Sequence, residues 1–190
     1  MRPRRQPART NAGELLKKAA VAVTLPATAK IWQDLVSVLG SSLGVDWAFL
    51  AEIKTSEKPI AKTLTAWHRG NIVPNFDYPF ERLPEDDALS QDICLFPDAA
   101  QKQLPNAWLK QIKAKAFGRA SLFDSLGRLR GILVIAHSQP LQDPDRIGAL
   151  LRIFAFRAAA ELEHVLPDDR LYDELLENAR ESRLRESHSP

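Results

Sequence analysis

The nine residues from Leu129 to His137 constrain the fold of this chain more than any other segment. Their sequence, LRGILVIAH, is apolar at consecutive positions in its centre, so both faces of an extended strand would be apolar there. Such a strand belongs inside a sheet that is covered on both faces. We therefore expect a central sheet with one layer of structure behind it and another in front of it.

Three further segments have the composition of strands, and short turns join the strands in pairs. Residues 45–53 and 60–67 are rich in aromatic and β-branched residues, and residues 56–59 form the turn between them. Residues 116–123 lead through the turn sequence DSLG into the strand at 129–137. Hairpin connections of this kind predict a mainly antiparallel sheet.

Two long helices flank these strands. Residues 27–43 repeat apolar side chains at helical spacing, and Gly44 stands where a left-handed residue would end the helix. Asp143 and Pro144 suit the N-cap and first helical positions of a second helix, which Pro167 ends. The apolar residues of this second helix cover more than one face, so it should pack on the sheet and on another helix. Three of them widen the stripe: Ile153, Phe156 and Ala160.

The chain divides into one domain and two flanking segments. Residues 1–26 form a basic leader with a short helix that begins at Asn11, and residues 27–165 form the α/β domain. Residues 166–190 form a charged amphipathic helix and a tail. Within the domain, residues 72–105 are irregular and hold five prolines, with a candidate short helix at 86–90 and a short edge strand at 93–96. Asn106 can cap a helix that continues to about residue 115.

Charge and cysteine content exclude several classes of protein. The net charge is +2, from 26 basic and 24 acidic side chains, which is unlike the strong basic field of a nucleic-acid-binding protein. One cysteine allows no intrachain disulfide, and no apolar run approaches the length of a membrane helix. We therefore expect a cytoplasmic protein that binds neither nucleic acid nor a membrane.

Several strings resemble the GAF domain, a small sensory module of signalling proteins such as sensor kinases and cyclases. They are LGVDWAFLAEI, NFDYPF, CLFPDAAQKQLP, SLGRLRGILVIAHSQPLQDP and LLRIFAFRAAAELEH, and the resemblance covers roughly residues 27–165. It implies an α+β fold with a central, mainly antiparallel sheet of five to six strands. Terminal helices would cover one face, and the irregular segment with its short helices would enclose a ligand pocket on the other.

The sequence departs from the known functional branches of this family. It lacks the N-K-F-D-E motif of cyclic-nucleotide-binding members, and Leu95 rather than histidine follows Cys94, unlike bilin-binding members. A single cysteine also differs from the methionine sulfoxide reductase branch. The resemblance implies a sensor or interaction module and leaves its ligand and any cofactor open.

Eight residues are candidates for a ligand-binding site in front of the sheet. Aromatic side chains typically line such pockets, although the same residues can form an ordinary core. Arg119 would favour an anionic ligand or would extend to solvent from an edge strand. Cys94 could be a reactive thiol or a small core residue, and His137 could reach the pocket or bond to the backbone at the strand end. The full set is Trp67, Phe76, Tyr78, Cys94, Phe96, Trp108, Arg119 and His137.

No pattern of catalytic or metal-binding residues is present. The four histidines lack metal-ligand spacing, and the eight glycines form no phosphate-binding loop. We therefore expect a non-enzymatic sensory or regulatory domain that binds a small molecule or partner, signals through its terminal helices and forms a homodimer. A thiol-based redox sensor or enzyme using Cys94 is one alternative. An interaction adaptor with an empty pocket is another.

Overall fold

The computed structural model describes residues 30–54, 60–80, 93–104 and 106–165, together with Lys17 and Ala20. The helices expected at 86–90 and in the C-terminal segment lie outside the described residues. So does the leader helix, apart from Lys17 and Ala20, which are helical.

The described residues contain seven strands that form one sheet, and every pairing between them is antiparallel. Six of them follow the order β3-β2-β1-β7-β6-β5, and β4 pairs with β2 off this path. The expected antiparallel sheet is therefore confirmed, with one short strand more than the expected five or six. The strands are β1 (Trp47–Lys54), β2 (Ile60–His68), β3 (Asn71–Val73), β4 (Asp77–Pro79), β5 (Ile93–Phe96), β6 (Ala116–Phe123) and β7 (Leu129–His137).

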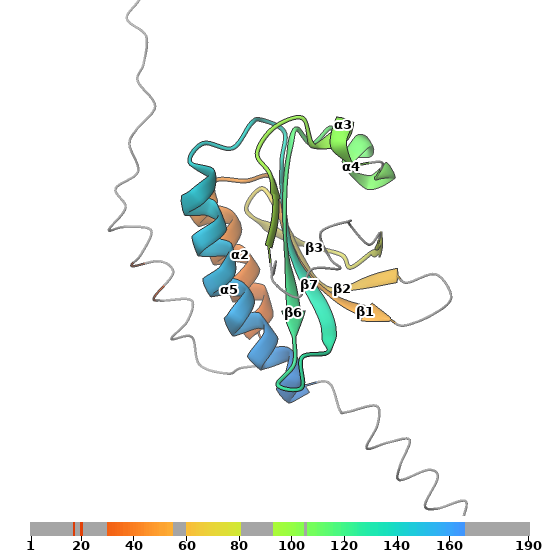
Figure 1. The fold of residues 1–190 in the computed structure, drawn as a ribbon, viewed down its shortest axis with the longest axis vertical. Helices are drawn as coiled ribbons and strands as arrows, with labels where there is room; N and C mark the ends of the chain where they lie inside the picture. Colours follow the sequence, from red (N-terminus) through yellow and green to blue (C-terminus); the bar gives the residue numbers. More distant parts are fainter. Residues whose placement is uncertain are drawn as a thin grey trace, which may run out of the picture.

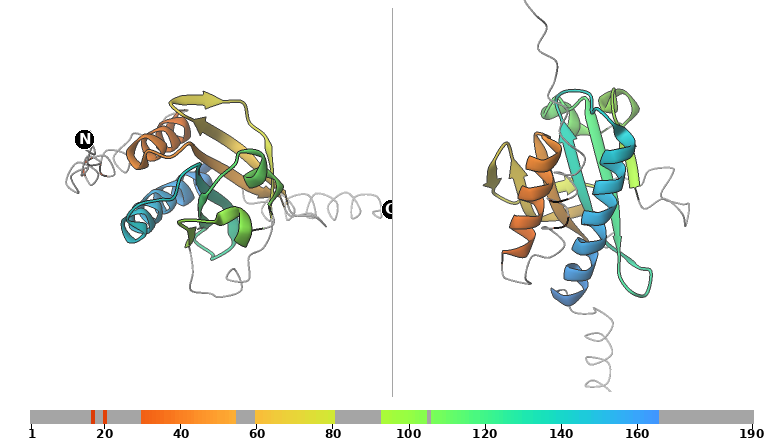
Figure 2. Two further views of the ribbon diagram at one scale, coloured as in Figure 1. Left: turned by 90° about the horizontal axis from the view of Figure 1, so that it is seen from above. Right: turned by 90° about the vertical axis from the view of Figure 1, so that its left-hand side faces the viewer.

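Helices cover both faces of this sheet. The long helices α2 (Ile31–Leu43) and α5 (Pro144–Val165) lie side by side on one face, as Figures 1 and 2 show. The short helices α3 (Ala100–Gln103) and α4 (Ala107–Gln111) lie on the other side, which we call the front face (Figure 1). This arrangement of terminal helices behind the sheet and short helices in front is the one that the sequence predicts.

The strand β7 supplies side chains to two separate cores. Leu133 and Ile135 belong to the core under α2 and α5, whereas Ile132 and Val134 belong to the core on the front face. All four are fully buried. Because successive side chains of a strand point to opposite faces, a central strand that is buried on both must be apolar at consecutive positions.

The helix ends agree with the sequence in part. Gly44 adopts the left-handed conformation with φ of 64° and its N–H bonds to the Gly40 carbonyl, as expected of a C-terminal glycine. The helix α2 begins at Ile31 rather than at residue 27. The Asn106 side chain does cap α4, but this helix ends at Gln111 instead of near residue 115. Lys113 takes a positive φ of 54°, which ends the helix early.

Candidate functional site

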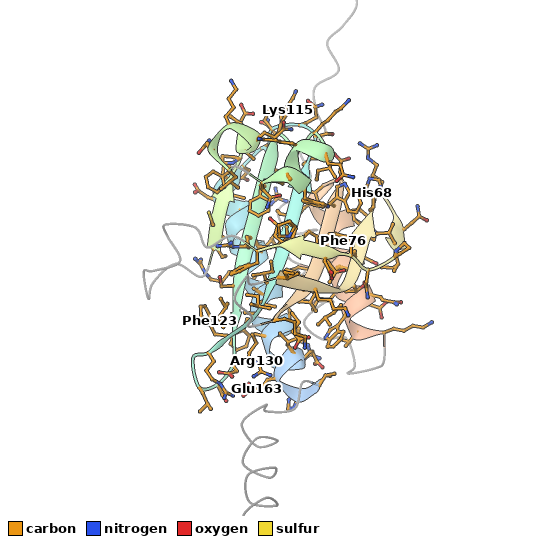
Figure 3. All side chains as sticks on the ribbon, turned by 90° about the vertical axis from the view of Figure 1, so that its right-hand side faces the viewer. His68, Phe76, Lys115, Phe123, Arg130 and Glu163 are labelled. Carbon is orange, nitrogen blue, oxygen red and sulfur yellow. The ribbon has the colours of Figure 1, made fainter. Side chains whose placement is uncertain are left out.

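Five aromatic side chains pack together on the front face. Trp108 of α4 lies at the centre of the cluster, where its ring stacks on Phe76 with centroids 5.8 Å apart and meets three further rings edge-on. Figure 3 shows Phe76 on the segment that crosses the front of the sheet. Contacts of this geometry fill the space between the rings. The cluster consists of Trp47, Phe49, Phe76, Tyr78 and Trp108.

Asn106 links the aromatic cluster to the start of α4. Its Nδ2 donates to the Tyr78 hydroxyl at 3.2 Å, and its Oδ1 accepts from the Leu109 backbone N–H, also at 3.2 Å. The Asn106 side chain is almost fully buried. A single buried amide therefore fixes both the helix that carries Trp108 and the strand that carries Tyr78.

Thr63 holds the segment between β3 and β4 against the sheet. The Thr63 hydroxyl accepts from the Phe76 backbone N–H at 2.6 Å and donates to the Phe76 carbonyl at 2.8 Å. The register of β1 against β2 shifts at Leu50, so that the pairing passes over Leu64. The Leu64 carbonyl accepts instead from the Asn75 side chain at 3.1 Å. The bulge in β2 thus creates the attachment point for this segment.

A second part of the front face lies over β5 and β6. Arg119 is 3% exposed, and its guanidinium lies 5.3 Å from the centre of the Phe80 ring. Arg119 pairs in register with Cys94 on β5 and Val134 on β7, so β6 is an interior strand. The alternative in which Arg119 extends to solvent from a sheet edge is therefore wrong. The Phe80 ring attracts the Arg119 guanidinium, so a positive charge is held in the interior of the front face.

Six of the eight predicted site residues lie on the front face, in two groups. Phe76, Tyr78 and Trp108 belong to the aromatic cluster. The second group consists of Arg119 on β6 with Cys94 and Phe96 on β5, where Cys94 pairs in register with Arg119 and Phe96 with Phe117. Both β5 residues are half-buried.

Trp67 and His137 lie elsewhere, and their expected place in a front pocket is wrong. Trp67 packs under α2 on the opposite face, where a Cβ added to Gly40 would come within 2.3 Å of its ring. His137 shares a strand face with Leu133 and Ile135, which point toward the long helices. The β-bulge in β2 explains the error for Trp67, because the extra residue reverses the alternation of faces along that strand.

A polar network that the sequence did not predict ties together three strand ends. One Asp46 carboxylate oxygen accepts from Arg69 Nε at 2.7 Å, and the other accepts from the Ser138 N–H at 2.7 Å and lies 3.1 Å from His137 Nδ1. Burial raises the pKa of Asp46, but the hydrogen bonds from Arg69 and Ser138 and the charge of His137 outweigh it and hold that pKa well below its usual range. Asp46 thereby stays ionised.

His68 lies beside this network and stacks on Trp47, with ring centroids 4.0 Å apart. Burial lowers the pKa of His68, the adjacent charge of Arg69 lowers it further, and Asp46 opposes both effects. The imidazole therefore favours its neutral form, which suits stacking on an indole. Nothing in the sequence indicated this network, because Asp46 lay within the predicted strand at 45–53, whereas β1 begins at Trp47.

An open groove lies on the helix side, at the edge of the sheet. It has a volume of about 280 Å³ and is lined by apolar side chains from β5, β6 and α5, with Ser121 and Arg152 as its polar members. The Phe156 side chain on its rim is 81% exposed, and Phe123 of β6 is 42% exposed. The apolar lining residues are Ile93, Phe123, Ala155, Phe156 and Ala159.

Neither a metal-binding cluster nor a helix able to span a membrane is found among the described residues. Within the described parts of residues 30–165 and at Lys17 and Ala20, no group of three or more histidine, cysteine or acidic side chains could hold a metal ion. Among the helices that the structure describes, none combines the length and apolar character needed to cross a membrane.

The sequence matches no protein-family model and no curated protein, whereas its fold matches solved structures of phytochromes. The wild-type chromophore-binding domain of phytochrome P1 from Stigmatella aurantiaca aligns with a TM-score of 0.59 at 9% identity, covering 84% of this chain and 62% of that one. The chromophore-binding domain of a mutant Stigmatella aurantiaca bacteriophytochrome in the Pr state aligns with a TM-score of 0.58 at 10% identity, over 79% of this chain and 59% of that one.

The photosensory core module of the Stigmatella phytochrome aligns with a TM-score of 0.60 at 10% identity, over 83% of this chain and 38% of that one. The chain thus spans less than two thirds of each of these structures. The architecture is that of a GAF-like domain, an α+β fold with an antiparallel sheet and with its first and last long helices packed on one face. At such low identity the likeness concerns the fold alone.

Proposed function

We propose that this chain is a non-enzymatic sensory or regulatory module that signals through its terminal helices and acts as a homodimer. The exposed apolar surface of α5 is the observation that carries this proposal. The helix already buries one face against the sheet and α2, yet Phe156 on the opposite side is 81% exposed. A large aromatic side chain in that position, next to an apolar groove, is typical of a surface that contacts another protein.

Part of the front face is suited to an anionic small molecule. Arg119 places a buried positive charge beside Phe80, and the half-buried Cys94 is its neighbour in register on β5. A guanidinium in such surroundings recognises carboxylate or phosphate groups with directed hydrogen bonds. The aromatic cluster next to it is packed by its own rings, so we place the ligand over β5 and β6 rather than over Trp108.

The packed aromatic cluster also favours a second candidate function. If the front face encloses no ligand, the chain is an interaction adaptor whose activity lies in α5 alone. Native mass spectrometry of freshly purified protein separates the two functions, because a sensor should retain or accept a small anion. If a Cys94→Ser variant retains a ligand of the same mass, the Cys94 thiol is not needed for binding. Arg119 would then be the group that recognises the ligand.

The dimer is tested by changing Phe156→Asp and measuring the mass in solution by light scattering. We expect the native chain to be dimeric and the variant to be monomeric, because a buried carboxylate would oppose the contact. Leu126→Asp is the matched control, since Leu126 is also exposed (67%) but lies in the turn between β6 and β7. A native chain that is monomeric at micromolar concentrations would contradict the dimer.

A further inference from the structure

The groove beside α5 and the aromatic ring on its rim form a surface that can fit a second copy of itself. Phe156 projects from α5, and the hollow next to it is bounded on the same helix by Arg152, Ala155 and Ala159. Arg152 and Ala155 lie four and one residues before Phe156, and Ala159 lies three residues after it. The Phe156 ring and the groove therefore lie side by side on one face of α5. A closed two-fold contact pairs one patch with itself, which requires a projection and a hollow on the same patch.

We propose that two protomers pair their α5 helices in antiparallel orientation, with Phe156 of each seated in the groove of the other. This inference rests on the proposed dimer and specifies its geometry. The groove, at about 280 Å³, has room for a phenyl ring, since an apolar cavity of roughly 150 Å³ already binds benzene. Ala155 is buried against the sheet, whereas the small side chain of Ala159 is half-buried and lets the two helix backbones approach closely.

Charge selects the antiparallel orientation over the parallel one. With the two-fold axis between Ala155 and Phe156, Arg152 lies opposite the partner's Ala159 and one helical turn from the partner's Glu163. Both Arg152 and Glu163 are exposed and can form an ion pair across the interface. In a parallel pair, Arg152 would instead face the partner's Arg152, and two like charges would be brought together.

The groove also extends the contact from the helix to the sheet. Ile93 of β5 and Phe123 of β6 form its outer wall, and β6 carries Arg119 on the front face. Figure 3 shows Phe123 and Glu163 toward the same end of the domain. A ligand that bound Arg119 and displaced β5 or β6 would therefore change the shape of the groove. That change would alter the contact with the partner's Phe156 in the groove.

Charge reversal tests the antiparallel contact through the dimer dissociation constant, measured by sedimentation equilibrium. Arg152→Glu and Glu163→Lys should each raise that constant about tenfold, because each leaves like charges opposed. The double variant should return it to within about threefold of the native value. Lys62→Glu, a reversal on the exposed face of β2, should leave it unchanged.

Disulfide formation gives a second measurement that does not depend on Glu163, which also bonds to the Ser125 turn. In a Cys94→Ser background, Arg152→Cys combined with Ala159→Cys should form a covalent dimer under oxidation, and neither single variant should. Two residues seven positions apart on one helix are too distant for an intrachain disulfide.

The outcomes separate this geometry from the dimer itself. A covalent dimer from Arg152→Cys alone would show a parallel pair and overturn the inference, while a monomeric Phe156→Asp variant would leave the proposed dimer standing. Failure of the double charge reversal to restore dimerisation, together with no covalent dimer from the double cysteine variant, would also overturn it. A native protein that is monomeric would overturn both.

Discussion

Asp46 and His137 meet across the ends of β1 and β7, with 3.1 Å between the Asp46 Oδ2 and the His137 Nδ1. They are 91 residues apart in the sequence. The same carboxylate oxygen accepts from the Ser138 N–H, and the other carboxylate oxygen binds Arg69 from the turn between β2 and β3. Asp46, which directly precedes β1, thus connects the start of β1 with the ends of β2 and β7.

Changing Asp46→Asn should lower the free energy of unfolding by about 1–3 kcal/mol at pH 7, because the charged hydrogen bonds to Arg69 and Ser138 are weakened. Urea unfolding measures this loss. Glu52→Gln is a suitable control, since Glu52 is an acidic residue of the adjoining strand β1 and its ion-pair partner, Lys54, is exposed. A loss as large in the control would contradict a special role for Asp46.

The stability of the native chain should also fall in acid. The pKa of Asp46 is lower in the folded protein than in the unfolded chain, so the unfolded state binds its proton first as the pH decreases. The stabilisation is complete above the unfolded pKa, near 4, and is lost as the pH falls toward the folded value. Asp46→Asn should therefore flatten the dependence of stability on pH between about pH 5 and 2.

Gly40 is required by the close approach of α2 to the sheet. A Cβ at this position would lie 2.3 Å from the Trp67 ring, which is itself buried. We expect Gly40→Ala to cost about 1–3 kcal/mol despite the better helix propensity of alanine. Gly148→Ala in α5 is the matched control, because nothing lies within 4 Å of the added Cβ, and it should stabilise by about 0.5–1 kcal/mol. Thermal unfolding of both variants measures the contrast.

The sheet was predictable from sequence because its signals are local. Residues 129–137 are apolar at consecutive positions, and hairpin turns join neighbouring strands, so composition alone indicates a covered antiparallel sheet. The short strands β3 and β4 were not predicted. They depend on contacts with β2 that no local pattern encodes, above all the three hydrogen bonds between Thr63 and Phe76.

The site was predictable by residue type and less so by position. Alternation along a strand assigns a face to each side chain, but one bulge reverses that assignment, and Trp67 lies beyond the bulge. Asp46 escaped prediction for another reason: its partners Arg69 and Ser138 come from distant segments, and only the folded sheet brings them together.

Asn106 connects the start of α4 to the aromatic cluster, and its removal should loosen both. Asn106→Ala deletes the cap on α4 and leaves the buried Tyr78 hydroxyl without its amide donor, so we expect a loss of about 1–3 kcal/mol. Asn106→Asp keeps the cap acceptor and should recover part of that loss. Because Trp108 follows two residues later, its fluorescence should shift toward that of solvent-exposed indole in the alanine variant. Unchanged emission together with unchanged stability would show that the cluster holds α4 without the help of this amide.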